Sequence, residues 1–168
     1  MSLSMHQVAI PGLIRTMTNL TAILDKAEAH CAAKKIEPSA LLAARLYPDM
    51  FPLLRQVQVV TNHATGLAAR LSGMDPPAFP DTEASFADLK ARLAKAIDFL
   101  KARQADQVDA GETRDLSLTV TGKPMTFKGR DFMLNVAIPN FYFHVTTAYD
   151  ILRHSGLEIG KRDYLGTH

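Results

Sequence analysis

The sequence predicts an all-α four-helix bundle with a small β-hairpin inserted between the third and fourth helices. Four long segments carry apolar residues every three to four positions, which is the spacing of one helix face, and proline or glycine separates them. One short segment alternates apolar and polar residues, which is the spacing of a β-strand. With 168 residues, 47% of them hydrophobic, the chain fits a single domain over residues 1–168.

The first predicted helix runs from about Ser4, a residue type suited to capping, to Lys34. Pro11 falls inside the pattern and is expected to kink the helix or to mark its true start. Ser39 is then expected to cap a single helical turn that reaches Arg45. The apolar face of the first helix comprises Leu13, Met17, Leu20, Ile23, Leu24 and Ala27.

The second predicted helix spans Pro48 to Leu71, and Gly73 ends it. Its apolar face comprises Leu53, Leu54, Val57, Val60, Ala64, Leu67, Ala68 and Leu71. The segment 73–81 that follows is rich in proline and glycine, so it is expected to lack regular structure.

The third predicted helix runs from Ser85 to about Arg103, and Ser85 with Asp88 resembles a capping box. Beyond it, residues 116–120 and the stretch around Met125 and Phe127 predict the two strands of the hairpin, with the turn at 121–123. Pro124 should confine the second strand to an edge, or stand as its first residue.

The fourth predicted helix runs from about Asp131 to Ser155, and Gly156 stops it before a short polar tail. Its apolar stripe comprises Leu134, Ala137, Phe141, Ala148 and Leu152.

Composition excludes several classes of function. The 19 basic and 17 acidic residues are interspersed, with no basic run, so nucleic acid is not an expected partner. No stretch approaches the ~20 apolar residues that span a bilayer, and the first residues lack the features of a signal peptide. Cys31 is the only cysteine, so the chain cannot form an internal disulfide. This composition fits a reducing compartment, and we expect a cytoplasmic protein. No Gly-x-Ser-x-Gly motif or glycine-rich phosphate loop is present.

Polar residues follow the edge of the apolar face on two helices. On the second helix they recur every seven positions, at Asp49, Gln56, His63 and Arg70. On the fourth helix they are Asn140, His144 and Thr147. A buried polar group without a partner costs about 1–3 kcal/mol, so the two columns are expected to meet. We therefore expect His63 and His144 to face a common cleft.

Two interpretations of this cleft remain open. Bundles build metal sites from inward side chains of facing helices, and neutral imidazoles suit zinc, nickel or iron. Only His63 and His144 converge, however, and Asn140 is a weak third ligand. Asp49 is excluded, since the predicted helix places it about 20 Å from His63. Alternatively, the histidines are hydrogen-bonded residues at the edge of the core, satisfied by Asn140 and Thr147.

Aromatic side chains cover the other faces of the fourth helix, at Tyr142, Phe143 and Tyr149. Tyrosine and phenylalanine are enriched where subunits meet, so we expect a homodimer.

Several segments resemble a bacterial family of unknown function within the DinB/YfiT-like superfamily of metal-dependent four-helix bundles. The segments are Leu46–Val57, the region of His63 and Gly73, Pro139–His144 and Gly160–Gly166. The resemblance implies a DinB-like fold, a dimer, and a metal site with one histidine from the second helix and two, four residues apart, from the fourth. His63 and His144 match the first and last ligands, whereas Asn140 stands where the pattern has a histidine. Some members of the superfamily are thiol-dependent transferases or hydrolases of thiol conjugates.

Two hypotheses follow. In the first, His63, His144 and Asn140 hold a divalent metal, zinc or nickel, in a degraded metalloenzyme site, or bind a small ligand there. In the second, the protein is a metal-free dimeric module that binds a small molecule or a partner and has no catalytic activity.

Overall fold

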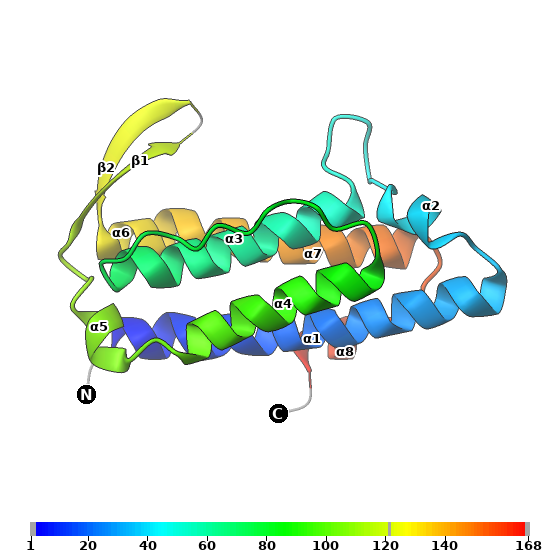
Figure 1. Ribbon diagram of the computed structural model, residues 1–168, viewed down its shortest axis with the longest axis horizontal. Coiled ribbons are helices and arrows are strands. Elements are labelled where there is room, and N and C mark those ends of the chain that lie inside the picture. Colours follow the sequence, from blue (N-terminus) through cyan, green and yellow to red (C-terminus); the bar gives the residue numbers. More distant parts are fainter. Residues whose placement is uncertain (1–2, 121, 167–168) are drawn as a thin grey trace.

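The computed structural model describes residues 3–120 and 122–166. Four long helical segments form the bundle, as the sequence predicts. They are α1 (Met5–Lys34), α3 (Leu53–Leu71), α4 (Phe86–Lys101) and a last segment that ends in α7 (Ile138–His154). Helix α3 contacts both α7 and α4, and α1 lies along α4 (Figure 1). The core is one cluster of buried apolar side chains between these helices.

Serine caps begin two of the long helices where the sequence predicts them, and both are capping boxes, of which the sequence analysis predicted only the one at Ser85. Ser4 accepts a hydrogen bond from the Gln7 amide at 3.3 Å, and the Ser4 amide donates to the Gln7 side chain at 3.0 Å. Ser85 and Asp88 make the equivalent pair before α4. Pro11 lies within α1, which begins at Met5, so the proline does not mark its start.

The start of α3 corrects the prediction. The helix begins at Leu53, five residues later than expected, with Pro52 at its N-cap. A residue before proline is disfavoured in helical geometry, so Phe51 stays outside the helix. Asp49 consequently lies in a loop and not on the helix. The short α2 (Pro38–Leu42) has Glu37 at its N-cap position, without a side-chain capping bond, and Pro38 in its first turn, so Ser39 is not its cap.

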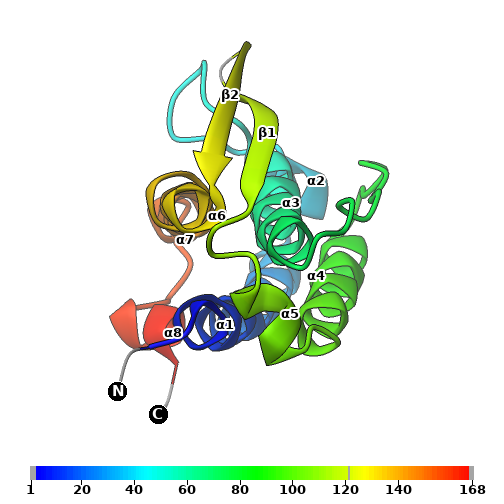
Figure 2. The same ribbon diagram turned by 90° about the vertical axis from the view of Figure 1, so that its left-hand side faces the viewer.

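The hairpin rises from one end of the bundle (Figure 2). Strand β1 (Asp115–Val120) pairs antiparallel with β2 (Lys123–Lys128), and Pro124 faces Thr119 in this two-stranded sheet. Gly122 has a φ of +80°, as the predicted turn requires, whereas Thr121 lies outside the described residues. At the base of the hairpin, a Cβ on Gly129 would lie 2.0 Å from the Gly111 carbonyl oxygen. Only glycine permits this approach.

The last long helix contains a π-helical turn that the sequence analysis did not predict. α6 (Gly129–Phe132) leads into η1 (Met133–Ala137), where the Ile138 amide donates to the Met133 carbonyl five residues back. Pro139, which lacks an amide hydrogen, follows directly. The wider turn rotates the residues before it, so Met133 is buried and Leu134, predicted on the apolar stripe, is 47% exposed.

The tail beyond Gly156 is not simply polar, which corrects a second expectation. Leu157 and Ile159 are buried, and α8 (Lys161–Leu165) lies against α1 (Figure 2). The Asn19 amide donates to the Tyr164 carbonyl at 3.0 Å, and Lys26 pairs with Asp163 at 2.6 Å.

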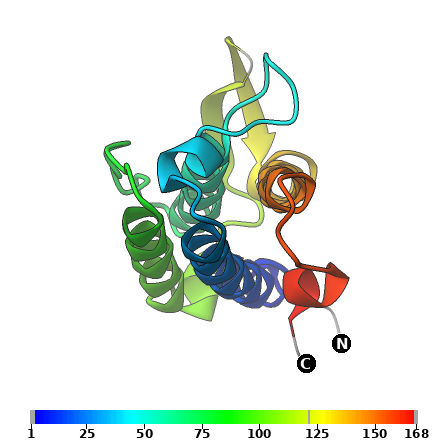
Figure 3. The same cartoon turned by 90° about the vertical axis from the view of Figure 1, so that its right-hand side faces the viewer.

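A further short helix, α5 (Ala105–Asp109), joins α4 to the hairpin and contacts α1. At the opposite end of the bundle, α2 lies over the end of α3 and contacts α1 and α3, and the loop between α2 and α3 projects away from the helices (Figure 3). No helix among residues 3–120 and 122–166 is long and apolar enough to cross a membrane.

Candidate functional site between α3 and α7

The two predicted polar columns meet where α3 packs on α7. Gln56, the fourth residue of α3, is buried, and its side-chain oxygen lies 2.6 Å from Nδ1 of His144 on α7. His63, two turns further along α3, lies beside the same histidine, with 5.6 Å between the ring centroids. The structure thus brings His63 and His144 together.

The Gln56 amide fixes the protonation of His144. The Gln56 nitrogen donates to the Phe51 carbonyl oxygen at 3.0 Å, and a carbonyl can only accept. The Gln56 oxygen must therefore face His144, where it accepts a hydrogen bond from Nδ1–H. In the neutral imidazole the other nitrogen, Nε2, then carries a free lone pair. This nitrogen can accept a hydrogen bond or a proton.

Aromatic side chains enclose the His144 ring. Phe51 lies nearly parallel to it with centroids 6.4 Å apart, and Phe143 meets it edge-on at 5.2 Å. These residues line a hollow of about 210 Å³ together with Asp49, Met50 and Gln56. We call it the His144 hollow. Asp49 was excluded as a ligand on the assumption that it belongs to the helix of His63. It lines the His144 hollow together with His144, whereas His63 does not line this hollow.

Both histidines are held neutral. Burial lowers the pKa of His63 to about 4, and the neighbouring His144 imidazole and the positive charge of Arg70 add to the effect. Burial also lowers the pKa of His144, with a further contribution from the nearby charge of Arg55. Near pH 7 both imidazoles therefore have one unprotonated nitrogen each.

Asn140 makes a local bond within its own helix. Its side-chain nitrogen donates to the Val136 carbonyl at 2.6 Å, in the π-helical turn. Thr147 likewise bonds the Phe143 carbonyl at 2.8 Å. The second interpretation expected Asn140 and Thr147 to hydrogen-bond the histidines, and neither side chain does. The hydrogen-bond partner of His144 is Gln56.

The side chains around His63 and His144 supply only part of the donor set that a divalent metal requires. A catalytic zinc site uses three protein ligands, and its imidazole lone pairs point at the ion. The rings of His63 and His144 are stacked with 15° between their planes, and stacked rings do not direct their in-plane lone pairs at one shared ion. The described residues contain no group of three His, Cys, Asp or Glu side chains placed to hold an ion. These residues do not fit a tightly held three-ligand metal centre.

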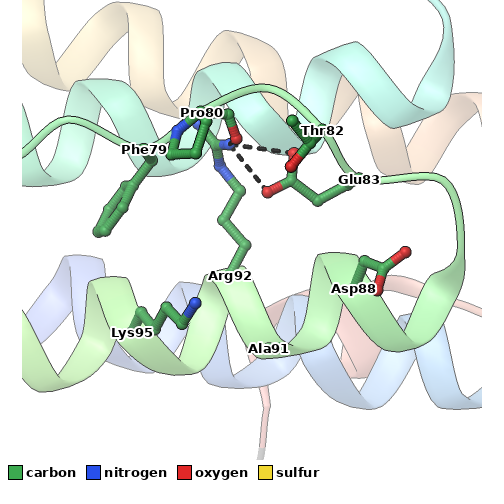
Figure 4. A pocket seen from close by; sticks show the side chains of 8 residues that line it. All are labelled: Phe79, Pro80, Thr82, Glu83, Asp88, Ala91, Arg92 and Lys95. Atoms are coloured by element: carbon green, nitrogen blue, oxygen red, sulfur yellow. Dashed lines mark hydrogen bonds and ion pairs between the residues drawn. The ribbon is translucent and has the colours of Figure 1, made fainter.

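A second polar cluster, which sequence reasoning missed, lies on the opposite side of α3. Arg92 on α4 is buried, and its guanidinium reaches the loop before α4 (Figure 4). Its Nη1 contacts the Pro80 carbonyl at 3.2 Å and Glu83 at 3.0 Å. Its Nε donates to Thr61 at 2.7 Å, and Nη2 contacts Asn62 at 2.8 Å and Asp81 at 3.0 Å. All five N–H groups have a partner, so this cluster fastens the loop to α3 and α4.

The aromatic residues of α7 are mostly covered within the chain. The Tyr149 ring packs edge-on against Tyr164 of α8, with centroids 5.8 Å apart. Tyr142 is half-buried, and its hydroxyl lies close to Gly12 of α1. Phe143 alone of the three is exposed. The homodimer stays a prediction, which light scattering of the purified protein would check.

Comparisons with known proteins agree with this fold. A crystal structure of a DinB family member protein from Shewanella denitrificans is 37% identical and has a TM-score of 0.87, covering 97% of this chain and 92% of that one. The comparison with curated proteins found no match. The model of a domain of unknown function, DUF1993, matches residues 5–165. The chain therefore belongs to the DUF1993 family, whose function is unknown, and it has a DinB-like fold.

Proposed function

We propose that the His144 hollow binds a small molecule that combines an apolar body with a hydrogen-bond donor, and that Nε2 of His144 accepts that bond. The observation that carries this proposal is the Gln56 amide, which receives Nδ1–H of His144 at 2.6 Å and leaves the other nitrogen unprotonated. A buried histidine held in one tautomer is ready to receive a donor at little entropic cost.

The lining of the hollow supports this class of ligand. Phe51 and Phe143 supply apolar surface, and both are partly exposed at the rim. Asp49 adds a carboxylate, which also accepts hydrogen bonds. At about 210 Å³ the hollow is smaller than the sites of drug-sized ligands, so the ligand is of the size of a single ring.

Phenol and anisole provide the test, since they differ in the hydroxyl donor that anisole lacks. We expect phenol to shift the NMR signals of Phe143 and His144 in a saturable way, and anisole to bind at least about fivefold more weakly. The substitution His144→Asn keeps an N–H donor near the position of Nδ1, which can still bond Gln56, but it removes the acceptor Nε2. The preference for phenol over anisole should therefore disappear. The control is His154→Asn, at the exposed end of α7. Equal binding of phenol and anisole to the native protein would refute the proposal.

A divalent metal is the second candidate, and the observation in its favour is the closeness of two neutral imidazoles. Two imidazoles on one zinc ion have centroids roughly 5–6 Å apart, because each Zn–N bond is about 2.0–2.1 Å. The 5.6 Å between His63 and His144 falls in that range, although the rings would have to turn. We propose at most a weakly held zinc or nickel ion, with Asn140 as an oxygen ligand.

Metal analysis of protein purified without a histidine tag tests this second candidate. Weak binding should be lost in His63→Ala, and Asn140→His should tighten it by tenfold or more, since it supplies the third imidazole. Sub-stoichiometric metal that is unchanged in His63→Ala would rule out an ion at this site.

A further inference from the structure

A second hollow lies at the other end of α3, beside the hairpin. It has a volume of about 380 Å³ and is lined by two arginines, Arg70 and Arg114, together with Gly73, Asp75, Asp115 and Ser117. Arg70 follows Gln56 by fourteen residues on α3, which places it about 21 Å away along the helix axis. This hollow, which we call the arginine hollow, is therefore separate from the His144 hollow.

Arg70 is half-buried and has few partners for its charge. Its Nη1 donates to the Gly66 carbonyl at 3.1 Å, and its guanidinium carbon lies 5.8 Å from the centre of the Phe132 ring. Among the residues that the structure describes, no Asp or Glu forms an ion pair with it. Burial lowers the pKa of Arg70, which reflects the loss of water around the charge. A guanidinium has five N–H groups, so most of those of Arg70 are left for another acceptor.

Arg114 lies just before β1 and reaches over the end of α3. A Cβ on Gly73 would stand 2.5 Å from its Nη1, and Gly73 has a φ of +73°. The glycine that ends α3 therefore also makes room for this guanidinium. Over the described part of the chain, Arg114 has no ion pair or side-chain hydrogen bond.

The acidic residues at the hollow leave both arginines unneutralised. Asp115 pairs with Lys128 at 2.8 Å, on the strand opposite. Asp75 is exposed and forms no ion pair with any described residue. The contrast with Arg92 is direct, because that arginine contacts two carboxylates and has all its donors matched.

We propose that the arginine hollow is a binding site for a small oxyanion, a phosphate or a carboxylate, held by Arg70 and Arg114. Guanidinium groups bind such anions through two parallel N–H···O bonds, and a partly buried guanidinium does so more strongly than an exposed one. The proposal is independent of the His144 hollow.

NMR titration of the full chain with sodium phosphate and sodium acetate tests it, with sodium chloride at matched ionic strength as the reference. Phosphate, acetate or both should shift the amide signals of Gly73 and Leu116 in a saturable way, and chloride should not. Arg114→Gln and Arg70→Gln should each weaken binding about tenfold. Arg130→Gln removes the same charge from an exposed position outside the hollow and should leave binding unchanged.

Saturation by phosphate alone identifies a phosphate site, and saturation by acetate as well identifies a general oxyanion site; both support the proposal. It is overturned if neither anion saturates, or if Arg114→Gln binds as tightly as the native chain. Arg114 is exposed, so this variant is expected to fold even where Arg70→Gln does not.

Discussion

Two polar clusters flank α3, and they differ in how completely their groups are matched. On one side Arg92 has a partner for each of its five N–H groups, drawn from α3 and from the loop before α4. On the other side His144 has Gln56 at Nδ1, and its second ring nitrogen has no hydrogen bond to any described residue.

The difference separates a structural cluster from a binding one. A fully matched buried charge stabilises the fold and has nothing left to offer a ligand. A histidine fixed at one nitrogen is rigid, yet it retains an acceptor at the other. Substitutions in either cluster therefore test this difference.

The largest effect is expected at Arg92. Arg92→Met leaves Glu83, which is only 11% exposed, without its cation, so unfolding should become easier by about 3–5 kcal/mol. Urea unfolding measures the loss. Lys95→Met is the control, because Lys95 lies one turn after Arg92 on α4 and is exposed; it should change stability by less than about 0.5 kcal/mol (Figure 4). If both variants lose equally little, Arg92 does not fasten the loop.

Gln56→Leu should be the next most costly change. It leaves the Nδ1 hydrogen of His144 and the Phe51 carbonyl without their partner, at a cost of about 1–3 kcal/mol. The same experiment measures it, with the exposed Gln107→Leu as the matched control. A stability equal to that of the native chain would mean that Gln56 does not hold the histidine.

Stability should also depend on pH in a definite window. The pKa of His63 is 6.5 in its ordinary state and about 4 in the folded chain, so the unfolded chain binds more protons between these values. The free energy of unfolding is therefore unaffected by the protonation of His63 above pH 6.5, and it decreases as the pH falls from 6.5 towards 4, because only the unfolded chain takes up the proton there. His63→Gln should flatten the dependence of the urea midpoint on pH across this window. An unchanged slope would contradict the lowered pKa.

Gln56→Glu gives the smallest and most specific effect. A carboxylate at this position would favour the charged imidazole, so the pKa of His144 should rise by about 1 pH unit or more. NMR titration of the ring protons of His144 follows it, with the same titration of the native chain as the reference. An unaltered His144 would show that residue 56 does not contact its ring.

The fold was predictable from local signals, and its departures have local causes. The buried faces of α1 and α3 and the capping boxes at Ser4 and Ser85 depend on neighbouring residues alone. The π-helical turn before Pro139 shifts the helix face by one residue, which a regular period cannot reveal. Pro52 sets the start of α3 and leaves Asp49 in the loop before it, a local signal that the apolar period alone does not show.

The candidate site was predictable only in part. The seven-residue spacing placed Gln56 and His63 on the flank that meets α7, and the structure brings His63 and His144 together. The role of Gln56 depends on the carbonyl of Phe51, whose direction is set by the loop before α3. Arg92 was missed because its partners come from a loop and a helix distant in the sequence.

The tautomer of His144 tests the central claim most directly. Nitrogen-15 NMR of the histidine rings near pH 7 distinguishes Nδ1–H from Nε2–H and from the charged ring. The account predicts a neutral ring with hydrogen on Nδ1 and a bare Nε2. Hydrogen on Nε2, or a charged His144 at that pH, would contradict it.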